Sequence, residues 1–170
     1  ALLRLMAPLL TFTTEEAWGH FPRKAGDPDS VHLTRFPEPD ELSAGLNAEQ
    51  QARLANWDKL LPVRDQVLKA LEVARQEKFI GAPLEARVRL KAGANLYPLL
   101  EEYRRELPAL FIVSQVLLEN HAEAELEVHV ERAAGVKCER CWKYSGLVGA
   151  EPAYPTVCDS CAAALKEIVG

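Results

Sequence analysis

The sequence lacks a long apolar segment. None of its apolar runs approaches the roughly 18 residues that a membrane-spanning helix needs, so we expect no membrane partner. The apolar opening, residues 1–10, has neither a basic leader nor a small-residue cleavage site, which argues against a signal peptide. The chain also starts without Met and inside a periodic pattern, so we expect a piece of a longer chain. We expect this protein to be cytoplasmic and monomeric.

Positive charge is also scarce. Lys and Arg together number 20 against 25 Asp and Glu, which gives a net charge of −5, so the chain as a whole does not have the charge of a nucleic-acid binder. The balance is uneven along the chain, with net charges of −3 over residues 1–63 and −4 over residues 107–135. Two segments could offer phosphates an uncongested positive surface: residues 64–106, with a net charge of +2, and residues 136–170, whose basic and acidic residues balance.

Catalytic patterns are missing too. We find no Ser-His-Asp arrangement, no paired catalytic carboxylates and no phosphate-binding Gly-rich loop. The histidines have no metal-ligand spacing with one another or with the cysteines: they are His20, His32, His121 and His129. The composition, 48% hydrophobic and 26% charged, is that of a globular protein. These features favour a binding module over a catalytic domain.

The first half of the chain predicts helices. Thr13 to Glu16 has the pattern of a capping box and predicts a helix start, and residues 22–46 predict a Pro-rich loop with at most an extended piece at Val31–Leu33. Asn47 and Gln50 predict the start of a longer helix, and Gly81 its left-handed end. The apolar stripe of that helix comprises Leu60, Val63, Val67, Leu71 and Ala74.

From Leu84 the hydrophobic period changes from 3.6 to 2. Alternation predicts strands at 84–90 and 126–130, an apolar run predicts another at 111–118, and a helix is expected at 95–106. We therefore predict an α+β protein in three parts: a helical bundle portion at 1–82, a small mixed α+β domain at 83–135 and a four-cysteine zinc ribbon at 136–170.

All the cysteines lie near the end of the chain, in two C-x2-C pairs: Cys138, Cys141, Cys158 and Cys161. Two residues between thiolates let a tight turn direct both sulfurs at one metal, and two such turns close a tetrahedral shell that suits one structural Zn²⁺ ion. Two disulfides, a thioredoxin-like redox pair and an iron–sulfur cluster are the alternatives.

Several motifs resemble a known family. Residues 137–144 (KCERCWKY) and 157–161 (VCDSC) resemble the C-terminal zinc finger of bacterial isoleucyl-tRNA synthetases, a finger type shared with formamidopyrimidine-DNA glycosylases. Residues 4–18 (RLMAPLLTFTTEEAW) and 57–64 (WDKLLPVR) are similar to the anticodon-binding helical domain of the class I isoleucine, valine and leucine group. Lys78 to Ala86 is similar to the turn that follows that domain. The likeness runs through nearly the whole chain in the family's order.

The resemblance implies the anticodon-arm-binding part of an ATP-dependent ligase that charges the isoleucine tRNA. The HIGH and KMSKS signatures of the class I catalytic fold do not occur in this sequence, so the resemblance implies that activation of isoleucine and editing belong to the rest of the synthetase chain. A glycosylase-like DNA-repair tail and a metal-stabilised protein-interaction module are the alternative functions.

Binding of single-stranded anticodon bases needs aromatic platforms beside positive charge. The first cysteine pair offers both, since Trp142 and Tyr144 lie among Lys137, Arg140 and Lys143. The alternative role of Trp142 is to pack on the metal site. Arg64 and Arg75 on the long helix are the next candidates for RNA contacts, and a solvated helix flank with local ion pairs is the alternative for both.

Overall fold

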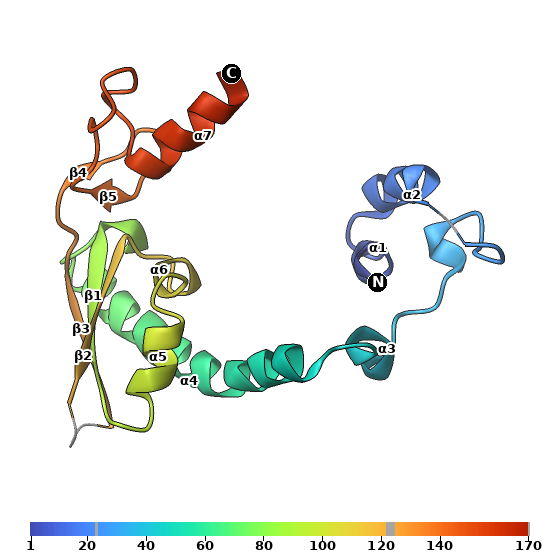
Figure 1. The fold of residues 1–170 in the computed structure, drawn as a ribbon, viewed down its shortest axis with the longest axis horizontal. Helices are drawn as coiled ribbons and strands as arrows, with labels where there is room; N and C mark the ends of the chain where they lie inside the picture. The colour runs from blue at the N-terminus through green and yellow to red at the C-terminus, as the bar shows by residue number, and fades with distance from the viewer. Residues whose placement is uncertain (23, 122–124, 170) are drawn as a thin grey trace. The chain divides into compact units, whose positions relative to one another are not determined.

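The computed structural model describes residues 1–22, 24–121 and 125–169. The chain divides into two compact units, residues 1–52 and 53–170. The described residues up to Glu85 form helices and no strand, and two small sheets with further helices follow, which confirms the predicted mixed α+β class (Figure 1). The finer division into parts at 82 and 135 stays a prediction.

The elements follow one another in this order: α1 (Leu2–Met6), α2 (Thr11–His20), η1 (Val31–Leu33), α3 (Pro39–Ser43), α4 (Ala48–Gln76), η2 (Pro83–Glu85), β1 (Ala86–Ala92), α5 (Tyr97–Glu102), α6 (Leu107–Leu110), β2 (Gln115–Asn120), β3 (Leu126–Arg132), β4 (Val136–Lys137), β5 (Tyr144–Ser145) and α7 (Asp159–Val169). No helix in the described part of the chain is both long enough and apolar enough to cross a bilayer.

The first unit has a small core around Trp18, which packs with Ala7 and Val31. The indole Nε1 of Trp18 donates to the carbonyl of Pro28 at 3.0 Å. The Glu15 carboxylate accepts from the backbone N–H of Val31 at 3.1 Å and so fixes the loop to α2. These long-range bonds close the Pro-rich loop over α2 and shape η1, a 3₁₀ turn where the sequence predicted an extended piece.

The capping box predicted at Thr13–Glu16 is wrong. Helix α2 already begins at Thr11, so Thr13 lies within its first turns. The neighbouring Thr14 is buried, and its hydroxyl donates to the Leu10 carbonyl at 2.8 Å. Burial of Thr14 and Trp18 on one face of α2 therefore sets the register of this helix.

The capping box predicted at the start of α4 is confirmed. The Asn47 side-chain oxygen accepts from the N–H of Gln50 at 2.9 Å, and the Gln50 side chain accepts from the N–H of Asn47 at 3.0 Å. The two bonds satisfy donors that the helix start leaves free. Pro62 lies inside the helix. The whole apolar stripe predicted for this helix is buried: Leu60, Val63, Val67, Leu71 and Ala74.

The end of α4 differs from the prediction. The residue with a left-handed backbone is Lys78, at φ 58°, not Gly81. The N–H of Phe79 donates to the Ala74 carbonyl at 2.9 Å, which closes the last turn. Ile80 is buried in the core just beyond this turn. The burial of Ile80 fixes where the helix turns back, although glycine adopts that backbone with less strain.

A three-stranded sheet follows, with β1 in the middle, β2 parallel to it and β3 antiparallel. Alternate residues of β1 are buried, from Ala86 through Val88 and Leu90 to Ala92, which confirms the predicted period of 2. The run predicted as a strand at 111–118 begins later, at Gln115, because Phe111 is the C-cap residue of α6 and Ile112 has φ 59°.

Helices α4, α5 and α6 contribute to one core with the sheet (Figure 1). Val67 of α4, Leu90 of β1, Leu100 of α5 and Leu107 of α6 all belong to it and are almost fully buried. The crossover that carries α5 and α6 is what allows β1 and β2 to run parallel. The sequence predicted one helix here, and the chain forms two short ones.

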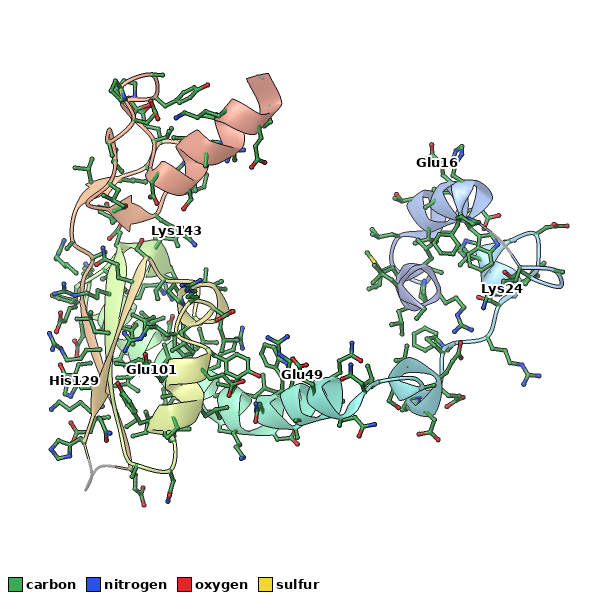
Figure 2. The ribbon with its side chains drawn as sticks, in the orientation of Figure 1. Glu16, Lys24, Glu49, Glu101, His129 and Lys143 are labelled. Atoms are coloured by element: carbon green, nitrogen blue, oxygen red, sulfur yellow. The ribbon has the colours of Figure 1, made fainter. Side chains whose placement is uncertain are left out.

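The opposite face of the sheet carries charged residues that pair across the strands. The Nε groups of Arg87 and Arg89 donate to the Glu131 carboxylate at 2.9 and 2.8 Å, and Arg89 also pairs with Glu119. His129 projects from β3 on the side of the sheet away from α5 (Figure 2). Three basic residues of the 64–106 segment are therefore paired with carboxylates on this face: Arg87, Arg89 and Lys91.

Candidate metal centre and nucleic-acid interface

The four cysteines form one cluster: Cys138, Cys141, Cys158 and Cys161. Their sulfurs all lie within 4.8 Å of one another, and all four thiols are free. The sulfurs of Cys141 and Cys158, which come from different pairs, are 3.8 Å apart. Cys138, Cys158 and Cys161 are buried and Cys141 is half-buried. The residues that the sequence singled out therefore meet in one place and are positioned to hold a metal ion.

The first pair is held by a tight hairpin. Strands β4 and β5 pair antiparallel, with Lys137 opposite Tyr144. Between them the N–H of Cys138 donates to the Lys143 carbonyl, and the N–H of Trp142 donates back to the Cys138 carbonyl, both at 2.9 Å. These bonds curl the backbone around Cys138 and direct its sulfur and that of Cys141 to the same side.

The second pair lies at the start of helix α7. Cys158 immediately precedes the helix and Cys161 lies in its first turn. The N–H of Cys158 donates to the Cys138 sulfur at 3.3 Å, and the N–H of Glu139 donates to the Thr156 carbonyl at 3.1 Å. Residues 136–169, which we call the finger, thus combine a two-stranded ribbon with a helix. The sequence reasoning did not predict this helix.

The cysteine environment controls the protonation of the free thiols. Burial opposes a thiolate at Cys138, but backbone N–H groups of Cys141, Cys158 and Arg140 donate to its sulfur and together lower its pKa to about 6. Burial raises the pKa of Cys141 to about 12 and also raises the pKa of Cys158. Metal binding must therefore displace protons from Cys141 and Cys158, whose pKa values are raised.

Trp142 is exposed beside this cluster. Its relative exposure is 62%, so the ring does not serve as core for the finger. The Lys137 ammonium lies 5.9 Å from the ring centroid, a cation–π distance that holds positive charge next to the aromatic face. Trp142 also has a left-handed backbone, at φ 65°, which is unusual for a large side chain.

The other predicted residues of the first pair divide into two groups. Lys143 is exposed, and in the described parts of the chain its side chain has no ion pair with an acidic residue (Figure 2). Arg140 donates from Nη1 to the Cys161 sulfur at 3.7 Å, which turns part of this guanidinium toward the cysteine cluster. Tyr144 is half-buried, and its backbone N–H donates to the hydroxyl of Ser114, the residue before β2. Lys137, Trp142 and Lys143 are thus the exposed members.

Arg64 and Arg75 lie on α4, away from this hairpin in sequence, and both have partners. The Nε of Arg64 donates to the Leu110 carbonyl at 3.3 Å and ties α4 to α6. Arg75 forms two hydrogen bonds to Glu72, at 2.9 and 2.7 Å. Those bonds with Arg75, then one from Gln76, lower the pKa of Glu72 to about 2. A solvated flank with local ion pairs, the alternative considered for these residues, describes Arg75 well.

Sequence reasoning missed the residues that join the finger to the sheet. Ser114 and Gln115, at the start of β2, hydrogen-bond to Tyr144 and Ala134. In the sequence both were only polar positions within an apolar run, so no local signal distinguished them.

Comparison with known proteins gives two results. The family profile described as "Anticodon-binding domain of tRNA ligase" matches residues 1–90. The isoleucine–tRNA ligases of Carboxydothermus hydrogenoformans and Desulforudis audaxviator are 48% and 43% identical to this chain over 99% and 98% of its length. The chain spans 18% of the length of each of these relatives.

The profile covers more than half of the chain, and the alignments with these relatives extend through the cysteine pairs as well. The resemblance found in the sequence motifs is thereby confirmed. This chain belongs to the family of anticodon-binding domains of tRNA ligases.

Proposed function

We propose that this chain is the anticodon-arm-binding part of an isoleucine–tRNA ligase, with a C-terminal zinc finger that contacts the tRNA. The observation that carries the proposal is the match of nearly the whole chain to isoleucine–tRNA ligases, together with the family profile over residues 1–90. The substrate of the complete enzyme is then the isoleucine tRNA. ATP-dependent attachment of isoleucine, and editing, belong to the remainder of the synthetase. We also propose that the protein is a monomer and acts in the cytoplasm.

The proposed metal is one structural Zn²⁺ held by the four cysteines. With Zn–S bonds of about 2.3 Å, a tetrahedral shell places its sulfurs about 3.8 Å apart. The Cys141–Cys158 separation of 3.8 Å agrees with this value. A four-iron cluster inserts irons and sulfides between its thiolates, so it needs a wider site than sulfurs within 4.8 Å of one another provide. Four protein ligands leave zinc no open position, so its role in the finger is structural.

The proposed RNA contacts centre on the exposed hairpin of the finger. Trp142 offers a stacking surface for an unpaired base, and Lys137 and Lys143 offer charge to the adjoining phosphates. Tyr144 and Arg140 are the other proposed RNA contacts of this hairpin. Further contacts are proposed at these helix residues: Arg64 and Arg75. We expect their contribution to be smaller, because each already has a partner within the protein.

Trp142→Ala tests this proposal. Loss of one stacked base costs about 1–3 kcal/mol, so we expect tRNA affinity to fall on the order of 5- to 160-fold. Leu147→Ala is the matched control, since Leu147 is also an exposed apolar residue of the finger. Zinc content, measured on the same samples, should stay at one ion per chain. Unchanged affinity for the isoleucine tRNA would remove Trp142 from the interface.

The same assay separates the competing functions. We expect affinity for the isoleucine tRNA to exceed that for duplex DNA with an abasic site, and to fall steeply as salt rises, because phosphate contacts release counterions. Tighter binding to the damaged duplex would favour the glycosylase-like alternative. Binding to neither would favour a protein-interaction module. Footprinting should show protection confined to the anticodon arm.

A further inference from the structure

The side-chain amide of Gln115 hydrogen-bonds to the linker, residues 133–135, that leads from β3 into the finger. Its Oε1 accepts from the N–H of Ala134 at 3.0 Å, and its Nε2 donates to the Ala134 carbonyl at 2.8 Å. The same Nε2 lies 3.4 Å from the Tyr144 carbonyl. The side chain thus pairs with Ala134 as a neighbouring strand would, and also reaches β5 of the finger.

Ser114 joins the finger to the sheet from the adjacent position. Its hydroxyl accepts from the N–H of Tyr144 at 2.7 Å and donates to the Leu84 carbonyl at 2.5 Å. A hydroxyl can make both bonds at once, because it has one donor and two acceptor sites. The first residue of β5 is thereby linked through one side chain to the turn before β1.

The linker itself lies against the finger without space for a side chain. Gly135 has φ 96°, and a Cβ at this position would lie 2.3 Å from the backbone carbon of Ser145. Just before it, the N–H of Ala133 donates to the Glu85 carbonyl at 2.7 Å. The junction is therefore a packed contact of backbone on backbone rather than a free tether.

This junction holds the hairpin that carries the proposed RNA contacts. Tyr144 is only two residues from Trp142, and it is paired with Lys137 across β4 and β5. A change in the orientation of β5 at its bonds to Ser114 and Gln115 would therefore move the indole and the lysines together.

We propose that Ser114 and Gln115 are positioning residues for RNA binding, because they fix the direction in which the finger presents Trp142 and Lys143 relative to the middle domain. The inference rests on the proposed function and adds residues that do not themselves touch RNA. A finger held in advance loses less orientational freedom when it binds than a tethered one, and this difference appears as affinity.

The test uses the full zinc-loaded chain with Ser114 and Gln115 both changed to Ala. We expect affinity for the isoleucine tRNA to fall on the order of tenfold, with zinc content unchanged. Backbone ¹⁵N relaxation should show residues 136–169 tumbling with residues 84–120 in the unmodified chain and separately in the variant. Gln66→Ala, an exposed glutamine on α4, is the matched control, and Ser114→Thr, which keeps the hydroxyl, should retain the affinity of the unmodified chain.

A double-mutant cycle separates positioning from a general structural effect. In a Lys137→Ala, Trp142→Ala, Lys143→Ala background the finger has lost the three exposed contacts that the junction positions, so the junction variant should cause little further loss of affinity. A full tenfold loss in that background would overturn the proposal, and so would common tumbling of the two regions in the junction variant. If the unmodified chain does not bind the tRNA, the proposed function fails, while the relaxation data still decide whether Ser114 and Gln115 hold the finger.

Discussion

The finger and the part of the chain that packs around the three-stranded sheet, which we call the middle domain, depend on different interactions for their folding. The middle domain buries aliphatic and aromatic side chains from α4, α5, α6 and the sheet in one continuous core. The buried residues of the finger are mainly its cysteines, with Val157 and Ala162 beside them. A segment of this size cannot bury enough apolar surface to fold alone, so we expect metal coordination to replace the core. The comparison teaches that neighbouring regions of one chain can depend on different conditions for their folding.

Metal removal should break the comparison most visibly. In a chelator we expect the finger to lose its structure and the middle domain to keep its own, because zinc contributes about 10–16 kcal/mol to the folding of finger peptides. Amide hydrogen exchange measures the two regions separately. Cys158→Ala without chelator should give the same pattern. Protection that persists at Cys138 and Trp142 without metal would contradict the metal-dependent finger.

The reverse perturbation is Leu90→Ala, which opens a cavity in the middle domain. Leu90 is fully buried, so we expect a loss of about 2–5 kcal/mol in the free energy of unfolding, measured by urea titration. Zinc content should not change. Leu61→Ala, at an exposed position of α4, serves as control and should cost far less. If Leu90→Ala also released zinc, the two regions would not be independently ordered.

A smaller effect is expected at the start of α4, where local hydrogen bonds act without metal or a large core. Asn47→Ala removes the acceptor for the Gln50 N–H and should cost about 1 kcal/mol of helix stability. Thr13→Ala is the informative partner, because Thr13 is exposed inside α2 and caps nothing. Chemical shifts of residues 48–52 report the fraying. Equal losses of helix stability in the Asn47→Ala and Thr13→Ala variants would mean that the cap at Asn47 does not stabilise α4.

The smallest effect concerns the charged face of the sheet. Hydrogen bonds from Arg89 and then Arg87 lower the pKa of Glu131 below its ordinary value. Its contribution to stability is therefore present above the pKa of the unfolded chain and is lost as pH falls through the lower pKa of the folded chain. Glu131→Gln should flatten this part of the pH dependence, measured as urea midpoints between neutral and acidic pH. Because these half-buried side chains remain in contact with solvent, high salt should weaken the effect in the unmodified chain.

Sequence patterns predicted the elements whose cause is local or periodic. The alternation from Leu84 to Leu90 predicted a half-buried strand, which the chain forms two residues later, at Ala86–Ala92. The cysteine spacing predicted that the sulfurs meet, and they do. The Asn47 cap was predictable because its partner Gln50 lies three residues away.

Where long-range contacts decide the structure, the predictions were wrong or absent. Thr13–Glu16 has the same local pattern as a true cap, but burial of Thr14 and Trp18 sets the register of α2. Lys78 adopts the left-handed backbone in place of Gly81 because Ile80 is drawn into the core. The bonds of Ser114 and Gln115 to the finger join residues some 20 to 30 positions apart, which no short motif encodes.

The left-handed backbone of Trp142 has a consequence for the stability of the finger. Glycine would adopt φ 65° without strain, whereas a large side chain in that region costs on the order of 1–3 kcal/mol. A Trp142→Gly chain should therefore form a more stable finger and, under the proposed function, should bind the isoleucine tRNA more weakly.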